Sequence, residues 1–243
     1  MHTIFFQEKT QVAENTFLYS FSRPENYSFD AGQYAVMRFL KDTLYPDNRG
    51  NARSFSFASA PYEEKLGFLM RKSESGFKKN IHALKSGDEV LLSDPLGHCR
   101  LSNIEPIAKK LVLICAGVGY SPMRSILRQI IHDKRNISCI LIDSNRIPES
   151  TPELSWTESL PLKYSHIKVI HTMTDMEHVD SVWGGRRGYI DKEFLRDCIK
   201  DTSETHYCIA AGSGFIHAMK NHLLALGISD DRMCFDNFGE TPS

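Results

Sequence analysis

The chain has 243 residues, of which 41% are hydrophobic, so it can bury a substantial core and is not a disordered polymer. Lys and Arg total 29 and Asp and Glu total 30, and residues 1–105 carry 13 of each sign. Because no part of the chain is strongly basic, the composition argues against nucleic acid and anionic membranes as partners. The N-terminus lacks a signal-peptide pattern, and no apolar run approaches the roughly 20 residues of a membrane helix. We therefore expect a cytoplasmic protein without membrane insertion.

Residues 1–105 have the pattern of short strands. Alternating or apolar segments at 16–21, 34–39, 53–58, 66–71 and 89–93 are separated by Gly, Pro, Asp and Asn turns. Phe77, Ile81 and Leu84 have the spacing of one short helix. Several short strands at regular spacing predict an antiparallel β-barrel or sandwich.

The pattern changes after residue 105, where buried strands alternate with helices. Apolar runs at 111–116, 137–142, 167–171, 206–211 and 233–235 predict strands, and the segments 123–131, 191–200 and 215–226 have helical periodicity. This alternation predicts a parallel sheet with helices on both faces. We therefore expect two domains, a barrel at 1–105 and an α/β domain at 106–243.

A glycine-rich turn follows the first strand of the predicted α/β domain. Gly117-Val118-Gly119-Tyr120-Ser121-Pro122 lies between that strand and a helix, where backbone N–H groups and the helix N-terminus can bind a phosphate. Pro122 suits the first helical position. Asp143 ends the next strand, as a ribose-binding acid does in a Rossmann dehydrogenase. That alternative leaves the barrel unexplained.

The six cysteines at 99, 115, 139, 198, 208 and 234 form no close pairs. Iron–sulfur and zinc sites usually show C-x-x-C-like spacing, so we expect neither a metal nor an iron–sulfur cluster on this chain. We expect buried or surface thiols that are kept reduced.

Several short motifs together resemble the ferredoxin–NADP reductase superfamily. Arg53-Ser54-Phe55-Ser56 resembles its R-x-[YF]-S motif, and Gly117 to Pro122 its G-x-G-x-x-P nucleotide loop. Further similar segments are Gly32-Gln33-Tyr34, Leu84 to Val90, Pro95-Leu96-Gly97 and Trp183 to Ile190. They occur in the family's order from about residue 5 to Phe238, so the chain resembles a single-chain member without a fused iron–sulfur domain.

The resemblance implies that the barrel binds FAD. Arg53 would pair with the pyrophosphate, Phe55 would pack against the isoalloxazine, and Ser56 would hydrogen-bond near flavin N5. Asp236 and Phe238 stand where the family places an acid and an aromatic residue close to the flavin, so the implied catalytic residues are Ser56, Phe55 and Asp236. The other implied flavin contacts are Ser54, Met70, Arg71 and Lys72, and the pyrophosphate cap is Gly76, Phe77, Lys78 and Lys79.

The resemblance also implies a nicotinamide dinucleotide on the α/β domain. The implied contacts are Gly117, Val118, Gly119, Ser121 and Pro122 at the nucleotide loop, Ser144 and Arg146 beside the adenosine ribose, and Ala211, Gly212 and Ser213 near the nicotinamide.

The chain departs from the family pattern at four places. Ala211-Gly212-Ser213 replaces the usual Cys-Gly-Pro, Lys79 replaces a Ser or Thr, and Phe55 replaces the commoner Tyr. Thr172 to Asp175 stands where NADP-specific members often have an arginine. Asp175 would repel a 2′-phosphate, which favours NADH, although Arg146, Arg186 and Arg187 leave NADPH open.

The implied function is an FAD-dependent NAD(P)H oxidoreductase. Hydride would pass from nicotinamide to FAD N5, and electrons would then pass to a separate protein acceptor such as a ferredoxin or an oxygenase component. Two alternatives remain: a reductase of free flavin or another small molecule, and a non-catalytic flavin- or nucleotide-binding electron-transfer subunit.

Overall fold

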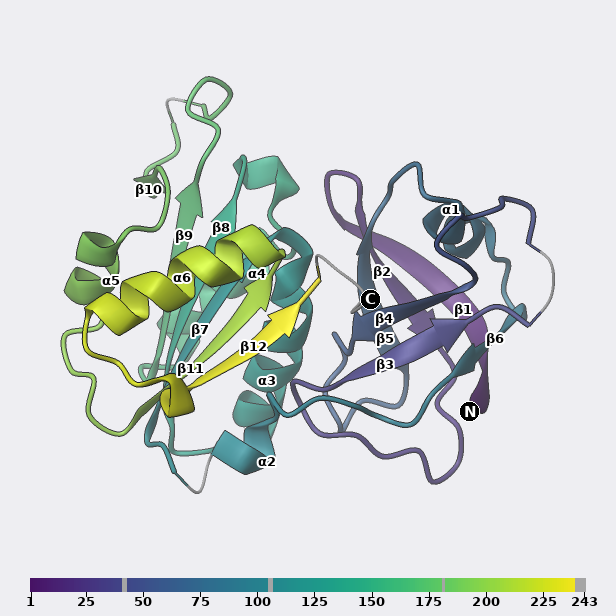
Figure 1. Ribbon diagram of the computed structural model, residues 1–243, viewed down its shortest axis with the longest axis horizontal. Helices are drawn as coiled ribbons and strands as arrows, with labels where there is room; N and C mark the ends of the chain where they lie inside the picture. Colours follow the sequence, from purple (N-terminus) through teal and green to yellow (C-terminus); the bar gives the residue numbers. More distant parts are fainter. Residues whose placement is uncertain (41–42, 105–106, 181, 239–243) are drawn as a thin grey trace.

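The computed structural model describes residues 1–40, 43–104, 107–180 and 182–238 and has two domains side by side (Figure 1). The N-terminal domain is a six-stranded sheet whose strand order is β4-β3-β6-β1-β2-β5, with antiparallel pairing throughout. Its strands are β1 (His2–Ala13), β2 (Thr16–Phe21), β3 (Tyr34–Arg38), β4 (Ala52–Ser56), β5 (Leu66–Arg71) and β6 (Glu89–Leu92), and its helix is α1 (Gly76–Ala83).

This sheet curls so that its two edges meet. The chain just after β4 joins β5 through a bridge between Phe57 and Phe68 and a 2.7 Å hydrogen bond from Ala58 N–H to the Gly67 carbonyl. Aromatic side chains fill the enclosed space, and Phe29 stacks on Phe57 at 4.1 Å between ring centroids. The sheet therefore has the predicted barrel-like curl, but among the described residues only this bridge joins its edges, so the barrel is not closed by a continuous ladder.

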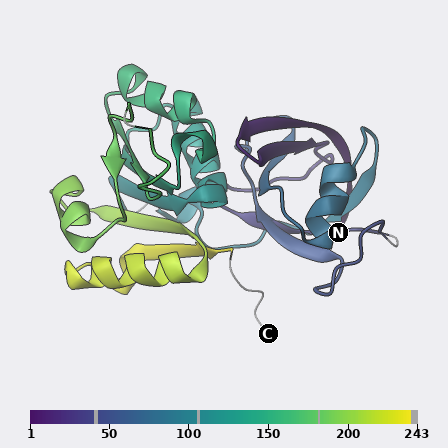
Figure 2. The ribbon, with the colours of Figure 1, turned by 90° about the horizontal axis from the view of Figure 1, so that it is seen from above.

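The C-terminal domain is a six-stranded parallel sheet with strand order β10-β9-β8-β7-β11-β12. Helices α3 and α4 cover one face, and α5 and α6 cover the other (Figure 2). The strands are β7 (Lys110–Ala116), β8 (Ser138–Asn145), β9 (Ile167–Met173), β10 (Arg186–Arg187), β11 (Thr205–Ala211) and β12 (Met233–Asn237). The helices are α2 (Leu101–Ile104), α3 (Tyr120–His132), α4 (Leu154–Lys163), α5 (Lys192–Cys198) and α6 (Ser213–Ala225), with 3₁₀ turns η1 (Gly117–Gly119), η2 (Pro148–Ser150) and η3 (Asp230–Arg232).

The predicted two-domain fold is confirmed, and its differences from the sequence pattern are local. The sequence pattern did not predict β1, because most of its residues after Phe6 are exposed on both faces of the strand. α4 was missed because it contains Pro161 and buries only Thr157 and Leu160. α3 begins at Tyr120, so Pro122 lies within its first turn and not at its first position. The expected boundary at residues 105 and 106 lies outside the described residues.

None of the helices in the described ranges is long and apolar enough to cross a membrane.

A buried arginine on α3 makes one of the contacts that join the domains. Arg124, which is 5% exposed, donates to the Ala58 carbonyl of the barrel at 2.7 Å and to both carboxylate oxygens of Glu153 at 2.8 and 3.0 Å. The neighbouring Ser125 donates to the Ser59 carbonyl at 2.7 Å. Because the chain 58–59 continues directly from β4, these bonds fix the position of β4 relative to α3.

We expect Glu153→Gln to destabilise the protein by roughly 3 kcal/mol, because it leaves the buried Arg124 charge without its main partner. Urea unfolding measures the change. The matched control is Lys65→Ala, which breaks an exposed 2.8 Å pair with Glu8 and should cost less than about 1 kcal/mol. Equal, small effects of both substitutions would show that the buried Arg124–Glu153 pair does not stabilise the fold.

Candidate active site

Two glycines determine the shape of the glycine-rich turn between β7 and α3. Gly117 has φ +55°, which favours glycine, and a Cβ on Gly119 would lie 1.9 Å from the Ala210 carbonyl oxygen of β11. Ser121 in the first turn of α3 is buried, and its Oγ has no hydrogen-bond partner among the described residues. The free N–H groups of a helix start, together with this hydroxyl, suit a bound phosphate group.

Arg71, which lies near this turn, is one of three cations that influence one another, and the other two are Lys78 and Arg49. Arg71 ends β5 and reaches the α/β domain, since its guanidinium lies 3.4 Å from the point where a Cβ on Gly117 would stand. Burial and the positive charges of Arg71 and Arg49 lower the pKa of Lys78. Within the described ranges, no carboxylate pairs with these three side chains. Their mutual repulsion would be relieved by an anion bound between the domains.

Arg53, in contrast, is already bound to the chain's own carboxylate. Its guanidinium pairs with Asp47 at 2.6 Å and donates to three nearby carbonyls, and it lies 5.4 Å from the centroid of the Phe77 ring. Asp47 also accepts a 2.9 Å hydrogen bond from Phe77 N–H at the start of α1. That hydrogen bond, and the charge of Arg53, lower the pKa of Asp47. Asp47 thus fills the anion position between Arg53 and α1.

The loop that carries Asp47 covers the first turn of α1. A Cβ on Gly76 would lie 2.2 Å from the Pro46 carbonyl oxygen, and the Asn80 amide bonds the backbone of Tyr45 at both 2.8 and 3.0 Å. Lys79 pairs with Glu74 at 2.7 Å. Of the predicted pyrophosphate cap, Lys78 is therefore the residue whose charge remains available.

The two faces of β4 have different surroundings. Arg53 and Phe55 share a face, since both contact the Phe77 ring, and Phe55 lies 5.8 Å from it. Phe55 is only 9% exposed, so little of its ring is available to a ligand. Ser54 is exposed on the other face, where Ser56 is buried. On β5, Met70 is buried beside Arg71, and the exposed Lys72 donates its N–H to the Asn15 carbonyl at 2.7 Å.

The contact between Ser56 and Asp236 joins the two domains at their facing edges. Ser56 Oγ donates a hydrogen bond to the carboxylate of Asp236, which lies 180 residues further along the chain on β12. Burial raises the pKa of Asp236 from 3.8 to about 6, and the Ser56 hydrogen bond opposes that rise. A carboxyl group that titrates near pH 6 beside a buried hydroxyl can hold or release a proton in the physiological range.

The loop after β11 lies beside this pair. Ala211 ends the strand, Gly212 caps α6, and Ser213 Oγ donates to the Asn237 side chain at 3.2 Å. The Ala211 carbonyl accepts a 2.9 Å hydrogen bond from Phe238 N–H. The predicted nicotinamide loop and the predicted aromatic residue are therefore adjacent to Asp236.

A cavity of about 390 Å³ lies beside Arg71, between the β1–β2 hairpin and the loops after β8 and β9. Arg146 enters it and pairs with Asp175 at 2.6 Å, while His178 contacts the other oxygen of Asp175 at 2.8 Å. These two hydrogen bonds lower the pKa of Asp175 to about 2. Ser144, two residues before Arg146 in the chain, is 7% exposed and is not among the residues that line this cavity.

Across the two domains, the structure brings Ser56 together with Asp236 and Arg71 together with Gly117, whereas the contacts of Arg53, Phe55 and Lys79 lie within the barrel. Asp47 and Arg49 were missed, because a Pro-Asp-Asn sequence is an ordinary turn signal and nothing local shows that its carboxylate turns towards Arg53. The expectation that all cysteines are free thiols is wrong for two of them. Cys99 and Cys234 form a disulfide with 5.3 Å between Cα atoms, across a sequence separation of 135 residues that no spacing rule covers.

Comparison with known proteins places these features in a family. Residues 113–221 match the oxidoreductase NAD-binding domain family. The glycine betaine monooxygenase reductase subunit of Pseudomonas aeruginosa is 23% identical, covering 93% of this chain and 61% of that protein. The nitrate reductase [NADPH] of Emericella nidulans is 31% identical over 56% of this chain and 16% of that protein. The chain thus spans less than two thirds of these curated relatives.

A solved structure supports the same arrangement. The ferredoxin NADP+ reductase from Neisseria gonorrhoeae with bound FAD and NADP superposes with a TM-score of 0.80 and 22% identity, covering 97% of this chain and 98% of that one. The chain therefore has the same two-domain fold as this reductase, with the glycine-rich turn inside the segment that matches the oxidoreductase NAD-binding domain family.

The raised pKa of Asp236 predicts a specific pH dependence of stability. The folded protein holds this proton between pH 3.8 and about 6, where the unfolded chain has released it, so the free energy of unfolding falls as pH rises through this window. Relative to Asp236→Asn, the wild type should lose up to about 3 kcal/mol between pH 4 and pH 7.

Urea unfolding at a series of pH values measures this difference. Asp231→Asn, an exposed acid just before β12, is the matched control and should follow the wild type across the window. Parallel curves for the wild type and Asp236→Asn would mean that Asp236 titrates normally.

Proposed function

We propose that the chain is an NAD(P)H-dependent flavin oxidoreductase that binds FAD on the barrel and the nicotinamide nucleotide on the α/β domain. The observation that carries this proposal is the Ser56–Asp236 hydrogen bond, because it brings the motif strand of the barrel against the last strand of the nucleotide domain. When both cofactors are bound, they supply the hydride and single-electron chemistry. The protein therefore has to bind the cofactors, align them and exclude water.

Three groups of residues fit those tasks. Arg71 and Lys78, with Arg49 at the rim, offer positive charge to the FAD pyrophosphate, and the Gly117–Gly119 turn with Ser121 offers N–H and hydroxyl donors to the dinucleotide phosphates. Ala211 to Ser213 and Phe238 border the nicotinamide side. Ser56 and Asp236 hold a proton at the Ser56 Oγ, next to the position that the resemblance gives to flavin N5.

The nucleotide favoured by these contacts is NADH. A 2′-phosphate beside Arg146 would have to displace the Asp175 carboxylate that Arg146 and His178 hold. The other arginines nearby are engaged elsewhere, because Arg186 donates to the Gly188 and Tyr189 carbonyls and Arg187 to the Val179 and Asp180 carbonyls. A doubly charged phosphate next to Asp175 would be repelled.

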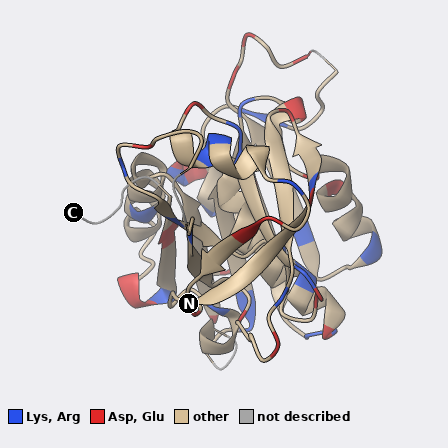
Figure 3. Cartoon of the chain, turned by 90° about the vertical axis from the view of Figure 1, so that its right-hand side faces the viewer, with Lys and Arg blue, Asp and Glu red and all other residues tan. Residues whose placement is uncertain are grey.

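We infer that the electron acceptor is a protein on a separate chain. The P. aeruginosa relative is the reductase subunit of a monooxygenase. Figure 3 shows basic and acidic residues interspersed along the chain, with neither sign dominating. A second candidate is a reductase that releases its flavin. It is favoured by Asp47, which occupies Arg53 and the start of α1 and so weakens the hold on a pyrophosphate.

Anaerobic stopped-flow mixing of the FAD-loaded protein with NADH and NADPH in parallel tests the proposal. We expect the flavin absorbance to bleach with both nucleotides and faster with NADH. Asp236→Asn should slow bleaching at least about tenfold, because the proton near Ser56 is no longer held by a titrating group. Asp231→Asn serves again as the control.

The possible results separate the candidates. A protein that takes up no FAD refutes the proposal, and tightly bound FAD that neither nucleotide reduces points to a non-catalytic subunit. FAD that stays bound through gel filtration supports a protein acceptor, whereas FAD that is lost supports a flavin reductase.

The position of Asp47 generates a separate prediction about flavin affinity. Asp47→Asn removes the carboxylate that competes for Arg53, so the Kd for FAD should fall about tenfold, which corresponds to about 1.4 kcal/mol. Fluorescence titration of FAD measures it. Asp94→Asn, an exposed acid on the same domain, is the control. Unchanged or weaker binding by Asp47→Asn would mean that the pyrophosphate does not use Arg53.

A further inference from the structure

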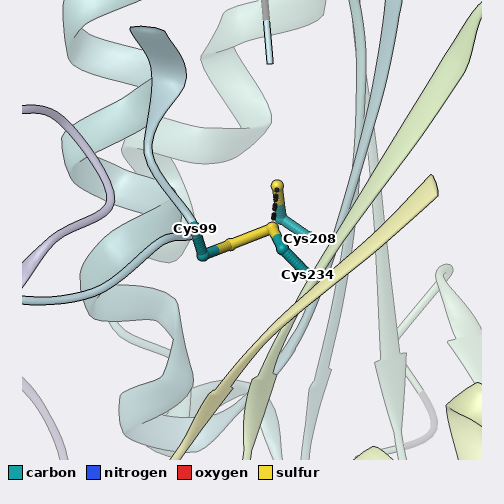
Figure 4. A group of neighbouring side chains, drawn as sticks. All are labelled: Cys99, Cys208 and Cys234. Carbon is teal, nitrogen blue, oxygen red and sulfur yellow. Dashed lines mark hydrogen bonds between the residues drawn. A yellow bond between two sulfur atoms is a disulfide. The ribbon is translucent and has the colours of Figure 1, made fainter. Parts of the chain in front are cut away.

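Three cysteines from separate segments of the chain lie close together (Figure 4). Cys99 lies between β6 and α2, Cys208 lies in the middle of β11, and Cys234 lies on β12. Cys99 and Cys234 form the disulfide, and the Cys208 sulfur lies 3.2 Å from the Cys234 sulfur. All three sulfur atoms lie within 4.8 Å of one another, so Cys234 has two sulfur neighbours.

The backbone allows Cys234 to bond either neighbour. Its Cα is 5.3 Å from that of Cys99, and Cys208 is its directly opposed partner in the parallel β11–β12 register. Neighbouring strands lie about 4.8 Å apart, and disulfides span roughly 4.4–6.8 Å between Cα atoms. Both pairings therefore fit without movement of a strand.

We propose that Cys99, Cys208 and Cys234 form a thiol–disulfide exchange site in which Cys234 alternates between two partners. The Cys208 thiol gives up its proton, and its sulfur forms a bond to the Cys234 sulfur. The Cys99–Cys234 bond breaks, and Cys99 leaves as a thiolate that takes up a proton. The exchange needs no external oxidant or reductant, because one disulfide and one thiol are present before and after it.

The two bonded states connect different parts of the molecule. Cys99 belongs to a segment held against the barrel, since the Leu101 N–H donates to the Ala31 carbonyl at 2.9 Å and a Cβ on Gly32 would lie 2.2 Å from the Cys99 carbonyl oxygen. A Cys99–Cys234 bond therefore links the barrel side of the molecule to the strand that carries Asp236. A Cys208–Cys234 bond lies within one sheet and releases that link.

Access to the site differs among the three residues. Cys234 is partly exposed, whereas Cys99 and Cys208 are buried. Burial raises the pKa of the Cys208 thiol, so the exchange should be slow at neutral pH and faster as pH rises. A small dithiol can reach the site from Cys234 and reduce the bond to two thiols, while its own two thiols become a disulfide.

Mass mapping of unreduced peptides from the full chain tests the site. The protein is oxidised with diamide at pH 7 and at pH 9, quenched in acid and alkylated with N-ethylmaleimide in denaturant. The wild type should show four free thiols, with a Cys99–Cys234 link and a Cys208–Cys234 link whose share increases at pH 9. After a dithiol, all six thiols should be free.

Single substitutions identify the shared sulfur. Cys99→Ser should show three free thiols and the Cys208–Cys234 link, and Cys208→Ser three free thiols and only the Cys99–Cys234 link. Cys234→Ser should keep all five thiols free. Cys198→Ser, on α5 across the sheet, should leave both links as in the wild type.

Two results overturn the proposal. One is a folded Cys99→Ser protein that keeps five free thiols after diamide. The other is a wild type without the Cys208–Cys234 link at either pH, which decides the question even if the Cys99→Ser protein does not fold. Neither result depends on flavin or nucleotide binding, so the proposed function is tested separately.

Discussion

The structure depends on the buried ion pair that Arg124 forms at the junction of the two domains. Its guanidinium is almost fully withdrawn from water, which is costly, and the cost is offset because Glu153 accepts two hydrogen bonds and the Ala58 carbonyl a third. This cation ties α3 to the chain that continues from β4. As a result, the start of α3 faces Arg71 and the end of β4 faces β12.

The positive charges of the barrel divide into two groups with different partners. Arg53, the residue that the motif singles out, is satisfied by Asp47 within its own domain, while Arg71 and Lys78 lie between the domains without a counter-charge among the described residues. An anion entering from outside gains most by neutralising the second group. Arg53 can bind an outside anion fully only after Asp47 has moved away, so under the proposed function the 45–50 loop would set the affinity for flavin.

The strand β12 carries both the acid of the candidate active site and a cysteine of the proposed exchange site. Asp236 and Cys234 are two residues apart, so both side chains project from the same face of the strand. One meets Ser56 of the barrel, and the other meets the cysteines of the connecting segment and of β11. A change in the disulfide partner of Cys234 therefore acts on β12, the strand that positions the Asp236 carboxyl group.

The sequence by itself determined the two-domain architecture, the parallel sheet, the glycine-rich turn and the resemblance to a family of reductases. These features follow from periodicity, turn residues and short motifs, which act between near neighbours in the chain. Only the tertiary structure decided that Asp236 meets Ser56 over 180 residues, that Asp47 binds Arg53, and that Cys99 reaches Cys234. Such pairs arise when helices and strands pack, because packing sets distances between residues whose separation in sequence carries no information about them.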